Sequence, residues 1–327
     1  MSFRLPTFVA ALVFSVFSQA PYGAEKVSFR SYDPSRYDEI LTGKFKESPV
    51  ELFGYLSIPA ASAGKVPAVV IIPGSGGYQP WMQTNVADFL NANGIATFII
   101  DPYTGRGVTE TASDQGRVSF PASLVDALAA YKLLSEHPAI DGQKIAITGF
   151  SRGGTMAIGA ADERVRRAVL GSDPGYAAYA PMYPGCVTQW RHPSVKEVKM
   201  LMMLGEKDDW TDPKLCIDYA DRFSKAGASV EVKIYPGAHH AWNSTVGTRR
   251  WLPKVQNFSD CVTLIEDNGT LVNTKSGKNG GTMPWSEWVK DLFSVCGRWG
   301  ANVASDAATV KSSNNDLLLF LNKSFGR

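Results

Sequence analysis

The sequence has little excess charge of either sign, because its 33 lysine and arginine residues are nearly matched by 31 aspartate and glutamate residues. It also lacks a basic stripe interleaved with aromatic residues. Proteins that bind nucleic acid or anionic membranes concentrate positive charge in such stripes or patches. The net charge of +2 therefore argues against both kinds of partner.

Patterns that hold metals or phosphates are also missing. The four cysteines form no C-x-x-C pair and have no histidine at ligand spacing, so no zinc site is expected. The glycine-rich segment PGSGG at 73–77 lacks the lysine and the hydroxyl of a phosphate-binding P-loop. We therefore predict neither a metal nor a cofactor.

The apolar stretch from Phe8 to Phe17 is too short to span a bilayer comfortably. Arg4 precedes this stretch and small residues follow it, which is the layout of a secretory signal peptide. We predict a signal peptide over 1–24, cut after 18–20 or near Ala24, and export to the periplasm or the medium. A retained anchor is the alternative.

Cysteine usage is compatible with export, since disulfides form in oxidising compartments and four cysteines allow three pairings. We favour the pairing of neighbours along the chain, which joins Cys186 to Cys216 and Cys261 to Cys296. Buried free thiols are the alternative.

Strand patterns alternate with helix patterns through most of the chain. Half-buried antiparallel strands are expected at 27–33 and 50–59, followed by continuous apolar runs at 67–74, 96–101, 144–149, 167–173, 198–205 and 230–237. Segments with helical periodicity lie between them, at 81–94, 120–137, 155–165 and 212–227. This order predicts an α/β fold with a doubly wound, mostly parallel sheet, whose ligand site lies at the carboxyl ends of the strands.

Three residue types typical of hydrolases follow three of these strands. Gly149-Phe150-Ser151-Arg152-Gly153 fits the G-x-S-x-G nucleophile elbow, although one such match could arise by chance among 30 glycines. GEKDDWTDP follows the strand at 198–205, and PGAHHAW follows the strand at 230–237. Serine, acid and histidine in this order favour a triad of Ser151, Asp208 or Asp209, and His239 or His240.

A triad also needs donors for the oxyanion. The backbone N–H of Arg152 is one candidate, because it opens the helix after the serine. The second is expected in PGSGG, from Ser75 or else Gly76; a simple glycine-rich turn is the alternative.

The motifs VVIIPGSGG, IIDPYTGRG, GFSRGG, LGEKDDWTDP and YPGAHHAW together resemble the dienelactone hydrolase family over roughly residues 65 to 245. The resemblance implies the α/β-hydrolase fold and a small-molecule ester or lactone substrate. It also assigns the base to His240, the acid to Asp208 with Asp209 as fallback, and the family's aromatic position to Trp242.

Two features depart from the family. The enzymes that give it its name use a cysteine nucleophile, whereas Ser151 is similar to the general esterase branch. The chain also continues past the base, with a hairpin predicted for CVTLIEDNGTLVN and helices for PWSEWVKDLFSVCG and LLLFLNKSFG. Similar extensions with cysteines at like places occur in some members, which favours the pairing of Cys261 with Cys296.

Two further side chains are candidates for substrate binding. Arg106 could hold a substrate carboxylate through a bidentate contact, or it could be a structural arginine that ties two loops together. Trp242 and Trp210 could form an apolar acyl or alcohol pocket, although tryptophans near loops are common without function.

We therefore expect residues 25–327 to form one α/β-hydrolase domain, with a core over about 65–245, an extension over about 246–303 and a last helix over about 304–325. The predicted function is that of an exported serine hydrolase that cleaves an ester or lactone through an acyl-enzyme. A peptidase or amidase on the same scaffold, and an exported pocket protein without turnover, are the alternatives. The sequence does not determine the oligomeric state.

Overall fold

The computed structural model describes residues 23–60, 64–195 and 197–327. All but the last two residues of the predicted signal peptide lie outside this part of the chain. No helix within the described ranges has the length and apolar character needed to cross a membrane.

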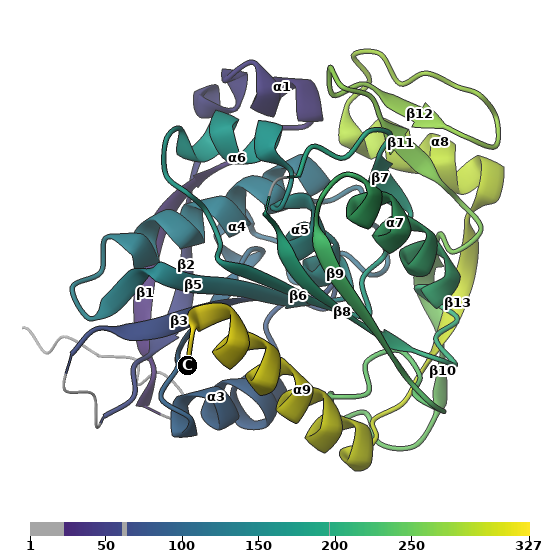
Figure 1. Cartoon of the computed structure of the whole chain (residues 1–327). Helices are drawn as coiled ribbons and strands as arrows, with labels where there is room; N and C mark the ends of the chain where they lie inside the picture. The colour runs from purple at the N-terminus through teal and green to yellow at the C-terminus, as the bar shows by residue number, and fades with distance from the viewer. Residues whose placement is uncertain (1–22, 61–63, 196) are drawn as a thin grey trace, which may run out of the picture.

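An eight-stranded sheet runs through the middle of the molecule (Figure 1) in the order β1-β2-β4-β3-β5-β6-β8-β9. Strand β2 is antiparallel to both neighbours, and the strands from β4 to β9 are parallel. The strands span Glu25–Tyr32 (β1), Pro49–Ser57 (β2), Val66–Ile72 (β3), Ala96–Asp101 (β4), Ile140–Phe150 (β5), Ala178–Met182 (β6), Lys199–Gly205 (β8) and Ser229–Tyr235 (β9). The predicted fold class is confirmed.

Helices cover both faces of this sheet (Figure 1). On one face lie α1 (Tyr37–Leu41), α4 (Phe120–Ser135), α5 (Arg152–Gly159), α6 (Glu163–Leu170) and α7 (Pro213–Lys225). On the other lie α2 (Pro80–Met82), the π-helical turn Gln83–Ala87, α3 (Asp88–Ala92) and α9 (Ala307–Phe325). Alternate residues of β3 enter the two cores, because successive strand side chains point to opposite faces. Continuous apolar runs therefore become central strands.

The expected strand at 167–173 is wrong. Its first four residues end helix α6, and the sixth strand, β6, comes later, with sequence AYAPM. In α6, Glu163 forms ion pairs with Arg166 and Arg167 three and four residues on, which only a helix brings together. Pro181 lies inside the fully buried β6, and proline is rare in central strands, so the strand pattern was easily missed.

Residues 250–303 build a lobe beside the carboxyl ends of the strands (Figure 1). Its elements are β10 (Arg250–Asn257), β11 (Thr263–Ile265), β12 (Leu271–Asn273), α8 (Trp285–Cys296) and β13 (Arg298–Val303). Strands β11 and β12 form the predicted hairpin, and β11 also pairs in parallel with β7 (Thr188–Trp190) of the core. The lobe is therefore joined to the core by backbone hydrogen bonds.

Both favoured cysteine pairings are present. Cys186 is bonded to Cys216 and Cys261 to Cys296, with Cα–Cα distances of 5.1 and 5.4 Å. The first ties the segment before β7 to α7, and the second ties the segment before β11 to the end of α8. Each disulfide thus fixes a segment near the end of the sheet at which the predicted site residues lie.

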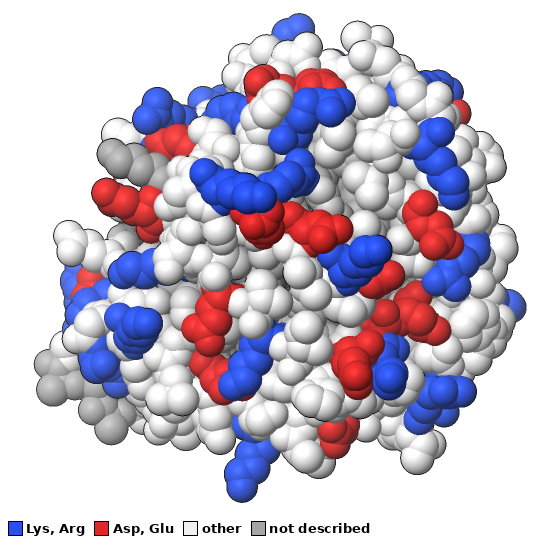
Figure 2. Space-filling model, turned by 45° about the vertical axis from the view of Figure 1, so that its right-hand side comes forward, with Lys and Arg blue, Asp and Glu red and all other residues white. Residues whose placement is uncertain are grey.

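Charged side chains of both signs are interspersed on the face shown in Figure 2, as the near-neutral net charge leads one to expect.

Candidate active site

Ser151 stands on a strained turn between β5 and α5. Its φ of 55° and ψ of −116° place a non-glycine residue in a conformation that is seldom populated. The flanking glycines allow this turn: a Cβ on Gly149 would lie 2.3 Å from the carbonyl oxygen of Gly153, and a Cβ on Gly153 would lie 2.1 Å from that of Ile72. The sequence G-x-S-x-G is thus required by close backbone approach, which fits a nucleophile elbow.

Asp208 follows β8 and is buried. Its Oδ1 accepts hydrogen bonds from the backbone N–H groups of Trp210 (3.0 Å) and Thr211 (2.8 Å), while the hydroxyl of Thr211 donates to Oδ2 at 2.8 Å. These three hydrogen bonds fix the orientation of the carboxylate. The acid is therefore held in place before any substrate binds.

His240 follows β9, and its Nδ1 lies 2.8 Å from Oδ2 of Asp208. A proton on Nδ1 satisfies this carboxylate and leaves Nε2 as the free base, the tautomer that a general base requires. The rings of Tyr183 and Trp210 each have centroids 4.8 Å from the imidazole, so the ring is packed from two sides. The side chain is buried and has little freedom to turn away.

Ser151 and His240 line the same cavity of about 450 Å³. Their side chains are not hydrogen-bonded to one another, and such contacts are commonly loose in hydrolases without substrate. Segment 74–77, Trp81, Met82, Val246 and Leu252 are also part of the cavity wall. The site is thus a largely apolar cavity with a nucleophile, a base and a carboxylate behind the base.

The loop after β3 brings its backbone next to the serine. A Cβ on Gly74 would lie 3.3 Å from Cβ of Ser151, which shows how closely the two segments approach. Among the hydrogen bonds of the described residues, the backbone N–H groups of Ser75, Gly76 and Arg152 have no acceptor. The Ser75 hydroxyl accepts from Nε2 of Gln115 at 2.8 Å, which helps to fix this loop. These three N–H groups therefore stay the candidate donors to an oxyanion.

The side chain of Arg152 has a structural role that its sequence motif did not indicate. Its buried guanidinium donates to the Gln115 side chain, to the carbonyls of Val118 and Ser119 and to the Ser123 hydroxyl, and it stacks on Phe120 with 4.6 Å to the ring centroid. Burial is the largest influence on the guanidinium and lowers its pKa. The arginine thus anchors the segment before α4 beside the nucleophile.

The alternative triad residues, Asp209 and His239, are placed differently. Both carboxylate oxygens of Asp209 accept hydrogen bonds from Asn302 of β13, at 2.9 and 2.6 Å. His239 lies outside the cavity wall, and its buried Nδ1 has no hydrogen-bond partner among the described residues. Geometry therefore favours Asp208 and His240 over their neighbours.

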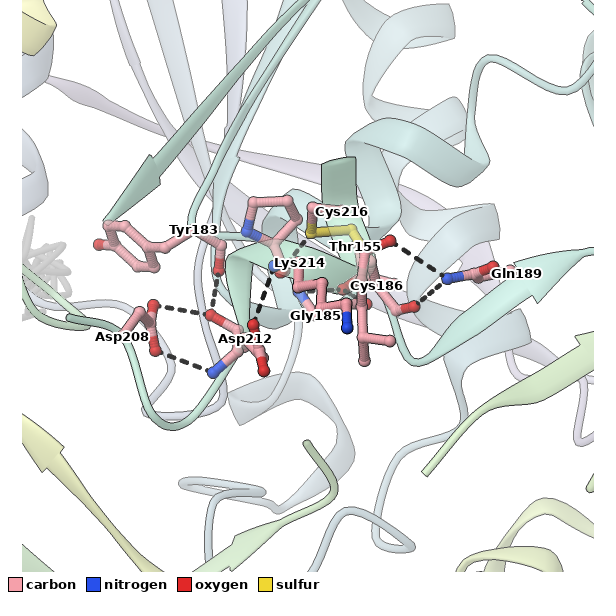
Figure 3. The surroundings of a disulfide bond; sticks show 12 residues. Thr155, Tyr183, Gly185, Cys186, Gln189, Asp208, Asp212, Lys214 and Cys216 are labelled. Carbon is pink, nitrogen blue, oxygen red and sulfur yellow. Dashed lines mark hydrogen bonds between the residues drawn. A yellow bond between two sulfur atoms is a disulfide. The ribbon is translucent and has the colours of Figure 1, made fainter. Parts of the chain in front are cut away.

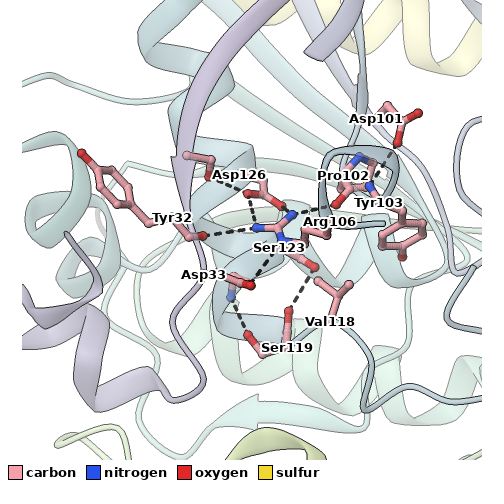
Figure 4. Close-up of polar contacts among 12 residues, drawn as sticks. Tyr32, Asp33, Asp101, Pro102, Tyr103, Arg106, Val118, Ser119, Ser123 and Asp126 are labelled. Atoms are coloured by element: carbon pink, nitrogen blue, oxygen red, sulfur yellow. Dashed lines mark hydrogen bonds and ion pairs between the residues drawn. The ribbon is translucent and has the colours of Figure 1, made fainter. Parts of the chain in front are cut away.

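Arg106 is a structural arginine, the second of the two roles considered for it. Ser151 borders two cavities, one of about 450 Å³ and a smaller one of about 60 Å³, and Arg106 lines neither of them. Its guanidinium binds both carboxylate oxygens of Asp126 at 2.8 and 3.0 Å, and it also binds Asp33 (Figure 4). Burial, the largest influence, lowers the pKa of Arg106, but the two carboxylates outweigh it and the net shift is upward. With these donors occupied, the side chain is not available to a substrate.

Trp242 is fully buried and also lies outside the cavity wall. Its indole N–H donates to the Ser313 hydroxyl at 3.2 Å, and its ring packs on Tyr183 and Tyr235. Through these contacts Trp242 anchors the loop that contains His240. Trp210, in contrast, lines the cavity and also contacts the imidazole.

Sequence reasoning missed Thr211 and Tyr183. The Thr211 hydroxyl oxygen lies 2.8 Å from Asp208 Oδ2, 3.1 Å from His240 Nδ1 and 3.1 Å from the carbonyl oxygen of Tyr183. Tyr183 has a positive φ of 36° and belongs to the segment that leads to Cys186, whose disulfide is shown in Figure 3 beside Thr155 and Gly185. In the sequence, only the position of Thr211 three residues after Asp208 pointed to their contact.

In residues 23–60, 64–195 and 197–327, no group of three or more histidine, cysteine, aspartate or glutamate side chains is arranged to hold a metal ion.

Comparison with known proteins gives consistent matches. Residues 52–250 match the sequence model of the dienelactone hydrolase family. A Bradyrhizobium sp. protein named "Probable 2-oxo-3-(5-oxofuran-2-ylidene)propanoate lactonase" is 26% identical over 228 residues, which cover 60% of this chain and 88% of that protein. Among solved structures, Thermogutta terrifontis esterase 2 phosphoramylated by tabun has a TM-score of 0.51 at 18% identity, over 69% of this chain and 88% of its own. The structural likeness concerns the fold.

Proposed function

Because the chain belongs to the dienelactone hydrolase family, we propose that it is an exported serine hydrolase that cleaves a carboxylic ester or lactone through an acyl-enzyme on Ser151. Membership of the family makes the protein a hydrolase of ester bonds. The main support for a Ser-His-Asp mechanism is the contact of His240 with Asp208, because His240 lines a cavity that Ser151 also lines. The lactonase name of the Bradyrhizobium relative supports a lactone as one possible form of the substrate.

In the first half-reaction, Oγ of Ser151 attacks the substrate carbonyl while its proton passes to Nε2 of His240. The Oγ–C bond forms, and the carbonyl oxygen takes the electron pair as an oxyanion. The N–H groups of Ser75 and Arg152 donate to that oxyanion, and Asp208 stabilises the imidazolium. Collapse of the intermediate breaks the bond to the alcohol oxygen, which takes the proton from His240.

In the second half-reaction, water replaces the alcohol. Its proton passes to His240, its oxygen bonds to the acyl carbon, and collapse returns the proton to Ser151 as the carboxylic acid leaves. In a lactone the alcohol stays attached to the acyl group, so ring opening yields one hydroxy acid.

Export is supported by one sequence prediction and one structural observation. The predicted signal peptide provides the route, and the Cys186–Cys216 and Cys261–Cys296 disulfides suit an oxidising compartment. We propose a periplasmic or secreted location on these grounds.

The test uses the two adjacent histidines. With p-nitrophenyl acetate, His240→Ala and Ser151→Ala are each expected to lower kcat about 10⁴-fold or more, because they remove the base and the nucleophile. His239→Ala is the matched control and is expected to keep activity within a few-fold. Equal losses in the two histidine variants, or full activity in Ser151→Ala, would contradict the proposed mechanism.

A further inference from the structure

Two cavities meet at Ser151. Besides the cavity of about 450 Å³, a second one of about 60 Å³ is lined by the same serine. Ser75 and Trp210 also line both cavities, so the two spaces adjoin at the nucleophile and at one of the proposed oxyanion donors. An ester bound with its carbonyl at this point would extend one part into each space.

The base distinguishes the two cavities. His240 lines the large cavity but not the small one, whereas Arg152 lines the small cavity but not the large one. The alcohol oxygen must take its proton from the imidazole as it leaves, so the alcohol lies on the side of the base. The acyl chain then extends to the opposite side, past the oxyanion donors.

We propose that the small cavity is the acyl pocket and that it restricts the enzyme to esters with a short, uncharged acyl chain, while the large cavity accepts alcohols of varied size. This assignment rests on the proposed function, since it presupposes an acyl-enzyme on Ser151.

The volume of the small cavity limits the length of the acyl chain that it can hold. One water needs roughly 10–15 Å³ of such space, so a cavity of about 60 Å³ holds about four to six small groups. Short acyl groups fit by this count, and an octanoyl chain, with seven carbons beyond the carbonyl, does not. The large cavity is more than seven times as voluminous.

The chemistry of the small cavity's wall favours an uncharged acyl chain. Most of its polar side chains are already paired: Gln115 with Ser75 and Arg152, Thr155 with Gly185, Thr211 with Asp208, and Oε1 of Gln256 with the backbone N–H of Gln115. Thr188 and Arg152 also line the cavity, and the side-chain nitrogens Nη1 and Nη2 of Arg152 already donate to protein groups. Most of the surface is contributed by aromatic and aliphatic side chains, namely Phe120, Val187, Phe258, Trp285 and Leu292.

Part of this wall lies outside the part of the chain that matches the family. Phe258, Trp285 and Leu292 all follow residue 250, where the match ends. Phe258 and Leu292 pack directly on the Cys261–Cys296 disulfide, and Cys186 lies between Gly185 and Val187 of the same wall. The extension therefore contributes to the size of the pocket, and a disulfide lies beside the wall on each side.

The experiment measures kcat/KM for p-nitrophenyl acetate, propionate, butyrate, hexanoate and octanoate. The wild type is expected to prefer propionate over octanoate by about 10-fold or more, the usual discrimination when extra methylenes do not fit. Leu292→Ala enlarges the small cavity and is expected to raise the octanoate-to-acetate ratio about 10-fold. Leu252→Ala, the same truncation in the wall of the large cavity, is the matched control and is expected to leave this ratio unchanged.

Val187→Phe provides a second variant that does not depend on the folding of Leu292→Ala. It fills the small cavity and is expected to lower butyrate turnover relative to acetate. A flat chain-length profile in the wild type, or a profile that responds to Leu252→Ala instead of Leu292→Ala, would overturn the assignment while esters are still turned over. Absence of turnover with every ester, together with no labelling of Ser151 by a fluorophosphonate, would instead remove the proposed function and this inference with it.

Discussion

At the scale of single residues, Asp208 and Asp209 show how neighbouring identical side chains come to differ. Asp208 accepts three hydrogen bonds within its own turn and faces His240, while Asp209 points to Asn302 of the extension. The β8 turn thus supplies one acid to the site and one to the contact with the C-terminal lobe.

This difference predicts unequal effects of the same substitution. Asp208→Asn replaces the acceptor of the Nδ1 proton with an amide and is expected to lower kcat by about 10³- to 10⁴-fold, as the wrong tautomer becomes favoured. Asp209→Asn is expected to affect chiefly the free energy of unfolding, by about 1 kcal/mol. Steady-state kinetics and urea denaturation of both variants measure this; a larger loss of kcat in Asp209→Asn would identify it as the orienting acid.

Arg106 gives a second prediction at this scale. Arg106→Met leaves Asp126 buried and unpaired, which is expected to cost about 3–5 kcal/mol of unfolding free energy. The double variant Arg106→Met/Asp126→Leu removes both charges and is expected to recover most of that stability, with kcat/KM within a few-fold of the wild type. A folded double variant that had lost its activity would show that Arg106 serves the substrate after all.

At the scale of elements, the sequence predicted the sheet better than the contacts around it. Continuous apolar runs identified β3, β4, β5 and β8, because a strand buried on both faces needs apolar residues throughout. The run at 230–237 identified β9, an edge strand whose residues are mostly exposed. The run at 167–173 misled because α6 is short and its helical ion pairs involve residues at its start. Strand β6 was missed because Pro181 argues locally against a central strand.

The C-terminal extension carries a prediction of its own. Cys261→Ser/Cys296→Ser frees the end of α8 from the segment before β11, and it is expected to cost about 3 kcal/mol of unfolding free energy. The acyl pocket should also become more permissive, because Phe258 and Leu292 rest on that disulfide. Urea denaturation and the p-nitrophenyl ester series measure the two effects; unchanged stability would show that the disulfide does not hold this lobe.

At the scale of the whole molecule, the parallel sheet explains why the site could be located from sequence. Parallel strands end at one edge, so residues after β5, β8 and β9 had to meet there. The contacts of Ser31 with Asp126 and of Gln115 with Gln256 join residues that are 95 and 141 positions apart, and no local pattern encodes them. The roles of Arg106, Arg152 and Trp242 therefore required the structure.

The small cavity can likewise be recognised only in the whole molecule. It combines the nucleophile elbow, the segment before α4, the β7 region and the extension, and no one of these elements contains a pocket motif. The family match accounts for the catalytic edge of the sheet, and residues beyond it complete the wall.

The most direct test of the account is intact-mass analysis of the purified mature protein after reaction with a fluorophosphonate, beside Ser151→Ala. We expect one adduct on the wild type and none on the variant, because only an activated serine reacts readily with this probe. A wild type that stays unlabelled while circular dichroism confirms its fold, or an adduct that persists in Ser151→Ala, would contradict the assignment of Ser151 as the nucleophile.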